Sequence, residues 1–198
     1  MVAAVSEAMD REPPPGRRRS RPALWTAIAV GVVALSLIGV LATRKSALDK
    51  LADSPLLGHP APEITGTSVT SGEAIRLDAF RGRWVAVNFF ATWCVPCRRE
   101  HPEFIKFSQH HLLQADASVL MVIYDDKVAS VRGFFQTNGG KWPIVADPDG
   151  QVALDYGVRG VPETFLVNPN GVIVARVVGG VTADGLERLL LQANARGA

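Results

Sequence analysis

The stretch Trp84–Cys97 (WVAVNFFATWCVPC) decides the fold of this chain of 198 residues. Its first half, Trp84–Phe90, is a compact apolar run that suits a buried strand. A proline then stands at the first turn of a predicted helix, which continues to about Leu113 with apolar residues at helical spacing. Both cysteines of the chain, Cys94 and Cys97, fall at the junction between this strand and this helix.

The residues that follow predict further alternation of strands and helices. Strands are expected at Ser118–Tyr124, Pro143–Ala146, Thr164–Val167 and Val172–Val178. Helices are expected at Lys127–Thr137, over one or two turns of Val152–Tyr156, and from a cap at Thr182 or Asp184 to about Asn194. Turn residues between the last two strands indicate a hairpin. The order predicts an α/β domain with a mixed central sheet covered by helices. Periodicity alone leaves the order of the strands open.

Residues 23–42 (ALWTAIAVGVVALSLIGVLA) contain no charge. Twenty apolar residues make a helix about 30 Å long, which predicts a transmembrane helix. Five arginines precede it, so the N-terminus is expected in the cytoplasm and the main domain on the outer, periplasmic side of the inner membrane, anchored by a single pass. A cleaved signal peptide is the alternative, because Val40-Leu41-Ala42 is a passable cleavage site, but the stretch exceeds the ~7–15 residues of such a segment.

The charges divide at the end of this segment. Residues 1–54 carry 8 Lys/Arg and 5 Asp/Glu, whereas residues 55–198 carry 13 and 14, so the net charge of +2 arises in the N-terminal part. The main domain is nearly neutral, which excludes a nucleic-acid partner. We therefore predict a cytoplasmic disordered tail at 1–22, the transmembrane helix at 23–42, a linker at 43–58 and the globular domain at 59–198.

The spacing of Cys94 and Cys97 favours redox chemistry. A disulfide between them closes too small a loop to remove much chain entropy, so a purely stabilising role is not expected. At a helix N-terminus, unpaired N–H groups and the helix dipole stabilise a thiolate at Cys94. Cys97 lies one turn further on the same side and can reach the first sulfur. This geometry suits a nucleophile and a resolving partner.

Three other interpretations of the cysteines fit the sequence less well. A c-type haem attachment needs His directly after the second cysteine, where Arg98 stands. A zinc site needs two more ligands, and His101, His110 and His111 are candidates without a recognisable spacing. A pair of inert buried cysteines fits poorly with the exposed junction. We expect no metal and no cofactor.

Three motifs of the chain also match a known family. They are Phe89–Arg98 (FFATWCVPCR), Gly58–Pro62 (GHPAP) and Tyr156–Val167 (YGVRGVPETFLV), which Asn168–Gly171 continues into the hairpin. Together they resemble the membrane-anchored, thioredoxin-like thiol:disulfide oxidoreductases of the TlpA/ResA/CcmG (DsbE) family. The resemblance covers about residues 56–192, nearly the whole outer domain.

The resemblance implies a thioredoxin fold with Pro162 in cis, facing Cys94. Cis peptides are essentially confined to X–Pro bonds, so Val161-Pro162 is chemically allowed. A loop of this kind leaves the backbone at Val161 free to pair with a substrate strand, and it excludes metals from the dithiol. Trp93 is expected to shield the sulfurs, although packing in the core explains an aromatic residue there almost as well.

Two carboxylates match the family in the same way. Glu100 stands three residues after Cys97, and Glu163 stands beside Pro162. A carboxylate near the thiols raises their pKa and can accept the proton of Cys97. The alternative for Glu100 is a solvated helix residue beside two arginines.

The dipeptide Val95-Pro96 bears on the direction of the reaction. It offers no positive or hydrogen-bonding group to stabilise the thiolate, so we expect a reductant. The family implies that the client is the Cys-x-x-Cys-His disulfide of apocytochrome c, reduced during cytochrome c maturation. It also implies a membrane electron donor of the CcdA/DsbD type. Val95-Pro96 and Ala91-Thr92 fit a general TlpA-like extracytoplasmic disulfide reductase equally well.

Two further classes of function remain as alternatives. Peroxide reduction is suggested by a similarity of residues 61–97 to peroxiredoxins, but the Pro-x-x-x-Thr-x-x-Cys pattern is missing. A copper-handling assembly factor would hold the metal through Cys94 and Cys97. Copper delivery usually adds a histidine later in the chain, and no histidine follows His111.

Overall fold

The computed structural model describes residues 21–42 and 51–197, and the chain divides into two compact units, Met1–Arg44 and Lys45–Ala198. The first unit contains helix α1 (Arg21–Ala42), where the sequence predicts a helix at 23–42. Among the described residues, no helix is both long and apolar enough to cross a membrane. Of the predicted tail and linker, residues 1–20 and 43–50 lie outside the described part of the chain.

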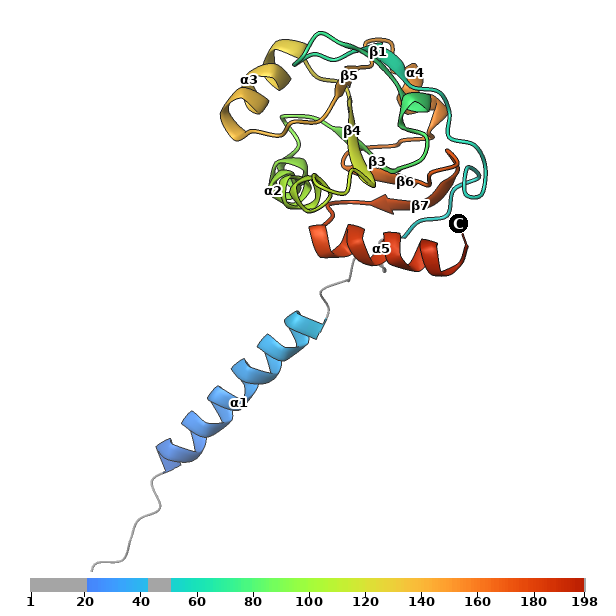
Figure 1. Cartoon of the computed structure of the whole chain (residues 1–198). Coiled ribbons are helices and arrows are strands. Elements are labelled where there is room, and N and C mark those ends of the chain that lie inside the picture. The colour runs from blue at the N-terminus through green and yellow to red at the C-terminus, as the bar shows by residue number, and fades with distance from the viewer. Residues whose placement is uncertain (1–20, 43–50, 198) are drawn as a thin grey trace, which may run out of the picture. The chain divides into compact units, whose positions relative to one another are not determined.

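The second unit is built on a five-stranded mixed sheet with the strand order β5-β4-β3-β6-β7 (Figure 1). Strands β3, β4 and β5 are parallel, whereas β6 is antiparallel to β3 and β7 is antiparallel to β6. The strands are β3 (Trp84–Phe90), β4 (Ala117–Ile123), β5 (Ile144–Ala146), β6 (Glu163–Val167) and β7 (Ile173–Val178). The predicted mixed sheet is confirmed, and the strand order adds what periodicity left open.

Helices cover both faces of this sheet. The helices are α2 (Val95–His110), α3 (Val128–Asn138), α4 (Gln151–Asp155) and α5 (Ala183–Ala195). Side chains of α2, α3 and α5 join one core cluster, and α4 joins the other. A short 3-10 helix, η2 (Leu77–Phe80), follows the hairpin of β1 (Thr65–Thr67) and β2 (Ala74–Arg76) and also packs on the α4 side.

Strand β3 lies in the middle of the sheet and is buried along its whole length. Because successive side chains of a strand point to opposite faces, Ala86 and Phe90 pack on the side of α2, and Val87 and Phe89 pack on the side of α4. A strand buried on both faces explains the near-continuous apolar run that the sequence shows. The end of β3 delivers the chain directly to the cysteines at the start of α2.

Two details differ from the predictions. Helix α2 ends at His110, and Leu112 and Leu113 lie in a turn with 73% and 92% of their surface exposed. His111 is the C-cap residue, whose backbone N–H still donates to the Phe107 carbonyl, and its ring lies 2.8 Å from the carboxylate of Asp116 beyond the turn. The hairpin β1–β2 and helix η2 were not predicted, since three or four residues carry too little periodicity.

The predicted cap of α5 is confirmed at Thr182, whose hydroxyl accepts the Gly185 N–H.

Candidate active site

The two cysteines form a disulfide at the N-terminus of α2, with Cα atoms 5.3 Å apart. Cys94 is the N-cap residue of the helix, and its sulfur accepts the backbone N–H of Cys97 at 3.1 Å. Cys94 retains 4% of its surface and Cys97 none. The helix start therefore holds Cys94 on the outer side and Cys97 beneath it, as the sequence predicts for an attacking and a resolving sulfur.

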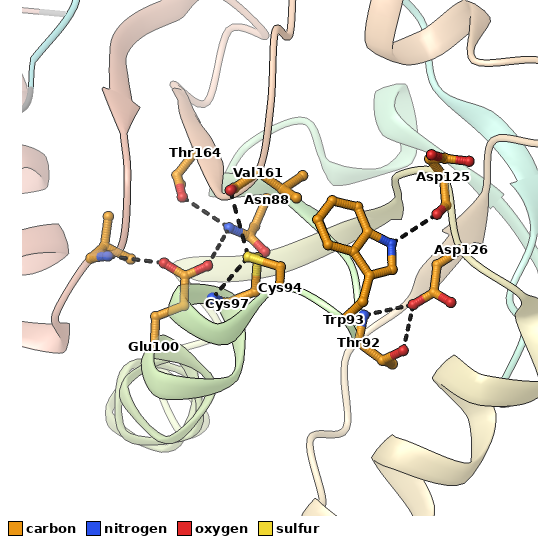
Figure 2. Close-up of a disulfide and its surroundings, with 11 residues drawn as sticks. Asn88, Thr92, Trp93, Cys94, Cys97, Glu100, Asp125, Asp126, Val161 and Thr164 are labelled. Carbon is orange, nitrogen blue, oxygen red and sulfur yellow. Dashed lines mark hydrogen bonds between the residues drawn. A yellow bond between two sulfur atoms is a disulfide. The ribbon is translucent and has the colours of Figure 1, made fainter.

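The cis-proline loop closes over the disulfide from β6. The peptide bond Val161-Pro162 is cis, as the family resemblance implies. The carbonyl oxygen of Val161 lies 3.5 Å from the Cys94 sulfur (Figure 2). The structure thus brings Val161 and Pro162 to the outer cysteine, where a client would meet both.

Trp93 stands at the rim of the site with 57% of its surface exposed. Its indole N–H donates to the carbonyl oxygen of Asp125 at 2.9 Å, which fixes the ring beside the disulfide (Figure 2). The neighbouring Thr92 is held by Asp126, which accepts both its N–H and its hydroxyl at 2.6 Å. An exposed and fixed ring fits a contact surface for a client better than a core position.

Glu100 lies in the buried layer beneath the disulfide, with 3% of its surface exposed. One carboxylate oxygen accepts the side-chain amide of Asn88 at 3.0 Å, and the other accepts the Val181 N–H at 2.9 Å (Figure 2). It stands three residues, less than one helical turn, after Cys97. This burial excludes the alternative that Glu100 is a solvated surface residue. Its position places a carboxyl group about one helical turn from the resolving cysteine.

Glu163 is also buried, but the structure places it elsewhere. It pairs with Phe89 across β3 and β6, so its side chain points to the α4 face of the sheet, opposite the disulfide. Its carboxylate forms an ion pair with Arg176 at 2.7 Å and accepts the Arg159 N–H at 3.0 Å. The expectation that Glu163 acts beside the thiols is therefore not supported by its position, because the sheet lies between them.

Sequence reasoning missed several residues of the site. Asn88 is fully buried in β3 and binds both Glu100 and Thr164. The loop after β7 also contacts the site, where the Gly179 N–H donates to the Pro162 carbonyl at 2.8 Å. An asparagine within an apolar strand was a visible signal. The loop contacts are made by backbone atoms and left no signal in the sequence.

The second turn of α2 carries a buried histidine. His101 packs against the rings of Phe134 and Phe135, with centroids 4.9 and 5.0 Å away, and one ring nitrogen lies 3.1 Å from the Gly139 carbonyl. Burial lowers its pKa from the ordinary value of 6.5. Among the described residues, no group of three or more His, Cys, Asp or Glu side chains is arranged to hold a metal ion.

Comparisons with known proteins agree with this geometry. Residues 57–176 match the AhpC/TSA family. The chain belongs to this family. It is 36% identical to the thiol-disulfide oxidoreductase ResA of Bacillus subtilis over 125 residues, which cover 63% of this chain and 69% of that protein. It is 31% identical to the thiol:disulfide interchange protein DsbE of Allochromatium vinosum over 133 residues, covering 66% of this chain and 71% of the other.

A solved structure supports the same fold. The thioredoxin domain of a thiol-disulfide oxidoreductase from Bacteroides vulgatus superposes with a TM-score of 0.61 at 27% identity, covering 70% of this chain and 98% of that one. The predicted thioredoxin-like fold and the family resemblance are confirmed. With its Cys94–Cys97 pair, this AhpC/TSA protein is a thiol-disulfide oxidoreductase.

Proposed function

We propose that this AhpC/TSA protein reduces disulfides of exported proteins outside the cytoplasm. The observation that carries the proposal is the arrangement of the disulfide: Cys94 caps α2 beneath the Val161 carbonyl, and Cys97 is fully buried behind it. A client disulfide can approach the outer sulfur along the cis-proline loop. The inner sulfur is reached only from Cys94.

The reaction begins with the reduced form of the pair. The Cys94 thiolate attacks one sulfur of the client disulfide, which forms a mixed disulfide and releases the other client sulfur as a thiolate that takes up a proton. The Cys97 thiol loses its proton and attacks Cys94, which forms the Cys94–Cys97 disulfide and releases the second client sulfur as a thiolate that takes up a proton. Two electrons pass to the client, so a donor must reduce the pair again.

We assign Glu100 as the proton acceptor for Cys97. A buried carboxylate next to a resolving thiol supplies a base at the one step in which that thiol must ionise. We assign Glu163 a different task, holding the cis-proline loop through Arg176 and Arg159. Trp93, Val161 and Pro162 form the surface that the client contacts.

We further propose that the client is the Cys-x-x-Cys-His disulfide of apocytochrome c and that the donor is a membrane protein of the CcdA/DsbD type. The family resemblance supports both assignments, and the uncharged Val95-Pro96 dipeptide supports a reductant. The uncharged sequence 23–42 and the arginines before it support a single-pass anchor in the inner membrane, with the domain on the periplasmic side.

The test replaces Cys97 with serine in the full chain and isolates mixed disulfides from the native cell. Cys97→Ser leaves Cys94 able to attack but removes the sulfur that releases the client, so the client stays covalently bound. The matched control is Cys94→Ser, which should trap nothing. Recovery of apocytochrome c supports the maturation role, whereas a broad set of exported proteins would indicate a general reductase. A reduction potential near −120 mV, that of a strong oxidant, would contradict a reducing role.

A further inference from the structure

We propose that Asn88 and Thr164 are positioning residues that hold Glu100 beneath the disulfide and connect it to the cis-proline loop. The inference rests on the proposed role of Glu100 as the proton acceptor for Cys97. The residues lie in the layer of side chains between β3, β6 and α2, which Figure 2 shows in close-up together with the disulfide.

Asn88 is a polar residue within an apolar strand, and its side chain is completely buried. Burying an amide costs free energy unless its polar atoms are hydrogen-bonded. Its nitrogen donates to Glu100 Oε1 and to Thr164 Oγ1, each at 3.0 Å, so both amide hydrogens are used. Its oxygen has no partner among the described residues. The N–H groups of the amide are thus hydrogen-bonded, whereas its oxygen is not. This indicates that Asn88 is placed here for the hydrogen bonds that it donates to Glu100 and Thr164.

The register of the sheet explains how Thr164 takes part. Asn88 and Thr164 are direct partners across β3 and β6, with both side chains on the disulfide face. Thr164 is two residues beyond Pro162. The Asn88 amide therefore joins the first turns of α2 to the strand that begins at the cis-proline loop.

The loop after β7 holds Glu100 from the other side. The Val181 N–H donates to Glu100 Oε2 at 2.9 Å, and the Gly179 N–H of the same loop donates to the Pro162 carbonyl at 2.8 Å. Each carboxylate oxygen has an N–H donor, and both donors belong to elements bonded to residues 162–164. A client that moves the cis-proline loop acts on Glu100 through both.

The donors have a chemical consequence for the thiols. Hydrogen bonds from N–H groups favour the ionised carboxylate, and a negative charge near a thiol disfavours its thiolate. Without the Asn88 donor, Glu100 takes up a proton or turns away, and the thiols then ionise at lower pH. Removing Asn88 should therefore act in the same direction as neutralising Glu100.

The test measures how the rate of iodoacetamide alkylation of the reduced full chain depends on pH. On the acidic side of the profile we expect Glu100→Gln to react about tenfold faster than the wild type, and Asn88→Leu about threefold faster. The double variant Asn88→Leu/Glu100→Gln should be no faster than Glu100→Gln alone, because Asn88 acts through Glu100. Thr164→Val, which keeps the side-chain shape, should show a smaller change in the same direction.

The matched control is Met121→Leu, since Met121 is the fully buried partner of Asn88 on β4 and has no polar role. It should leave the pH profile unchanged. An Asn88→Leu profile equal to that of the wild type, or an effect that adds to that of Glu100→Gln, would overturn the inference and leave the role of Glu100 intact. An unchanged Glu100→Gln profile would instead refute the proposed proton acceptor. If Asn88→Leu does not fold, Thr164→Val and its double variant with Glu100→Gln decide the same question.

Discussion

The two faces of the central sheet each bury one glutamate near the active site, and they hold it in different ways. On the disulfide face, Glu100 accepts hydrogen bonds from the Asn88 amide and the Val181 N–H. On the opposite face, Glu163 forms an ion pair with Arg176, whose side chain is 12% exposed. Arg176 also donates to the carbonyls of Gly157 and Asp53.

The difference separates two uses of a buried carboxylate. The guanidinium beside Glu163 compensates its charge and joins the cis-proline loop to β7, so this carboxylate serves the position of the loop. The N–H donors of Asn88 and Val181 fix the Glu100 side chain in the layer beneath the disulfide. This difference in position matches the two proposed roles, in which Glu100 acts on the disulfide chemistry and Glu163 holds the loop around it.

Breaking the ion pair should give the largest effect. Arg176→Met leaves the Glu163 charge buried without its partner, and we expect a loss of about 3–5 kcal/mol in the free energy of unfolding. Urea denaturation of the full chain measures it. The double variant Arg176→Met/Glu163→Met removes both charges and should recover most of the loss, since a pair of apolar residues of similar size needs no compensation.

The matched control for this prediction is Arg76→Met. Arg76 forms ion pairs with Glu63 and Asp78, but all three side chains are more than half exposed. Solvent screens such pairs, so the change in unfolding free energy should be much smaller than for Arg176→Met. Equal losses in the two variants would show that Arg176 is no more than a surface charge.

Neutralising Glu163 should lower the stability of the protein without changing the reactivity of the thiols, unlike neutralising Glu100. Glu163→Gln keeps the shape of the side chain but leaves Arg176 without a counter-charge, and we expect a loss of roughly 1–3 kcal/mol in unfolding free energy. The pH profile of thiol alkylation should stay that of the wild type, because the carboxylate lies across the sheet from the sulfurs. If Glu163→Gln accelerates alkylation as Glu100→Gln is expected to, the assignment of Glu163 to the loop is wrong.

The fold could be predicted from the sequence to the extent that its elements are long and periodic. Strands β3, β4 and β7 bury whole faces, and each ends within one residue of the expected range. The hairpin β1–β2 could not be found, because three-residue strands are fixed by contacts with distant parts of the chain, such as the Val69 N–H bond to the Ile144 carbonyl. Strand order also depends on such contacts.

The site residues that lie close together in sequence on one helix could be predicted, whereas the face of the sheet on which a strand residue lies could not. Cys94, Cys97 and Glu100 share one helix, so their spacing alone brings them together. Glu163 stands next to the cis-proline in sequence, but the alternation of β6 turns its side chain away. Applied to residues 163 and 164, the rule that neighbouring strand residues face opposite sides would have favoured Thr164 for the disulfide face.

The smallest expected effect concerns a second titratable group on the disulfide face. His101 is buried among aromatic rings, and this burial lowers its pKa below 6.5. The unfolded chain therefore binds a proton at His101 more readily than the folded one. The contribution of His101 to the free energy of unfolding is therefore complete above pH 6.5 and is lost as the pH falls through the lowered pKa.

Replacing this histidine should remove that part of the pH dependence. His101→Gln cannot titrate, and its amide can still donate to the Gly139 carbonyl, so the variant should lose less stability than the wild type when urea denaturation of the full chain is compared at pH 7 and pH 5. The control is His110→Gln, at an exposed position nine residues further along α2, which should keep the wild-type dependence. If His101→Gln keeps the wild-type difference between the two pH values, the acid sensitivity does not arise from His101.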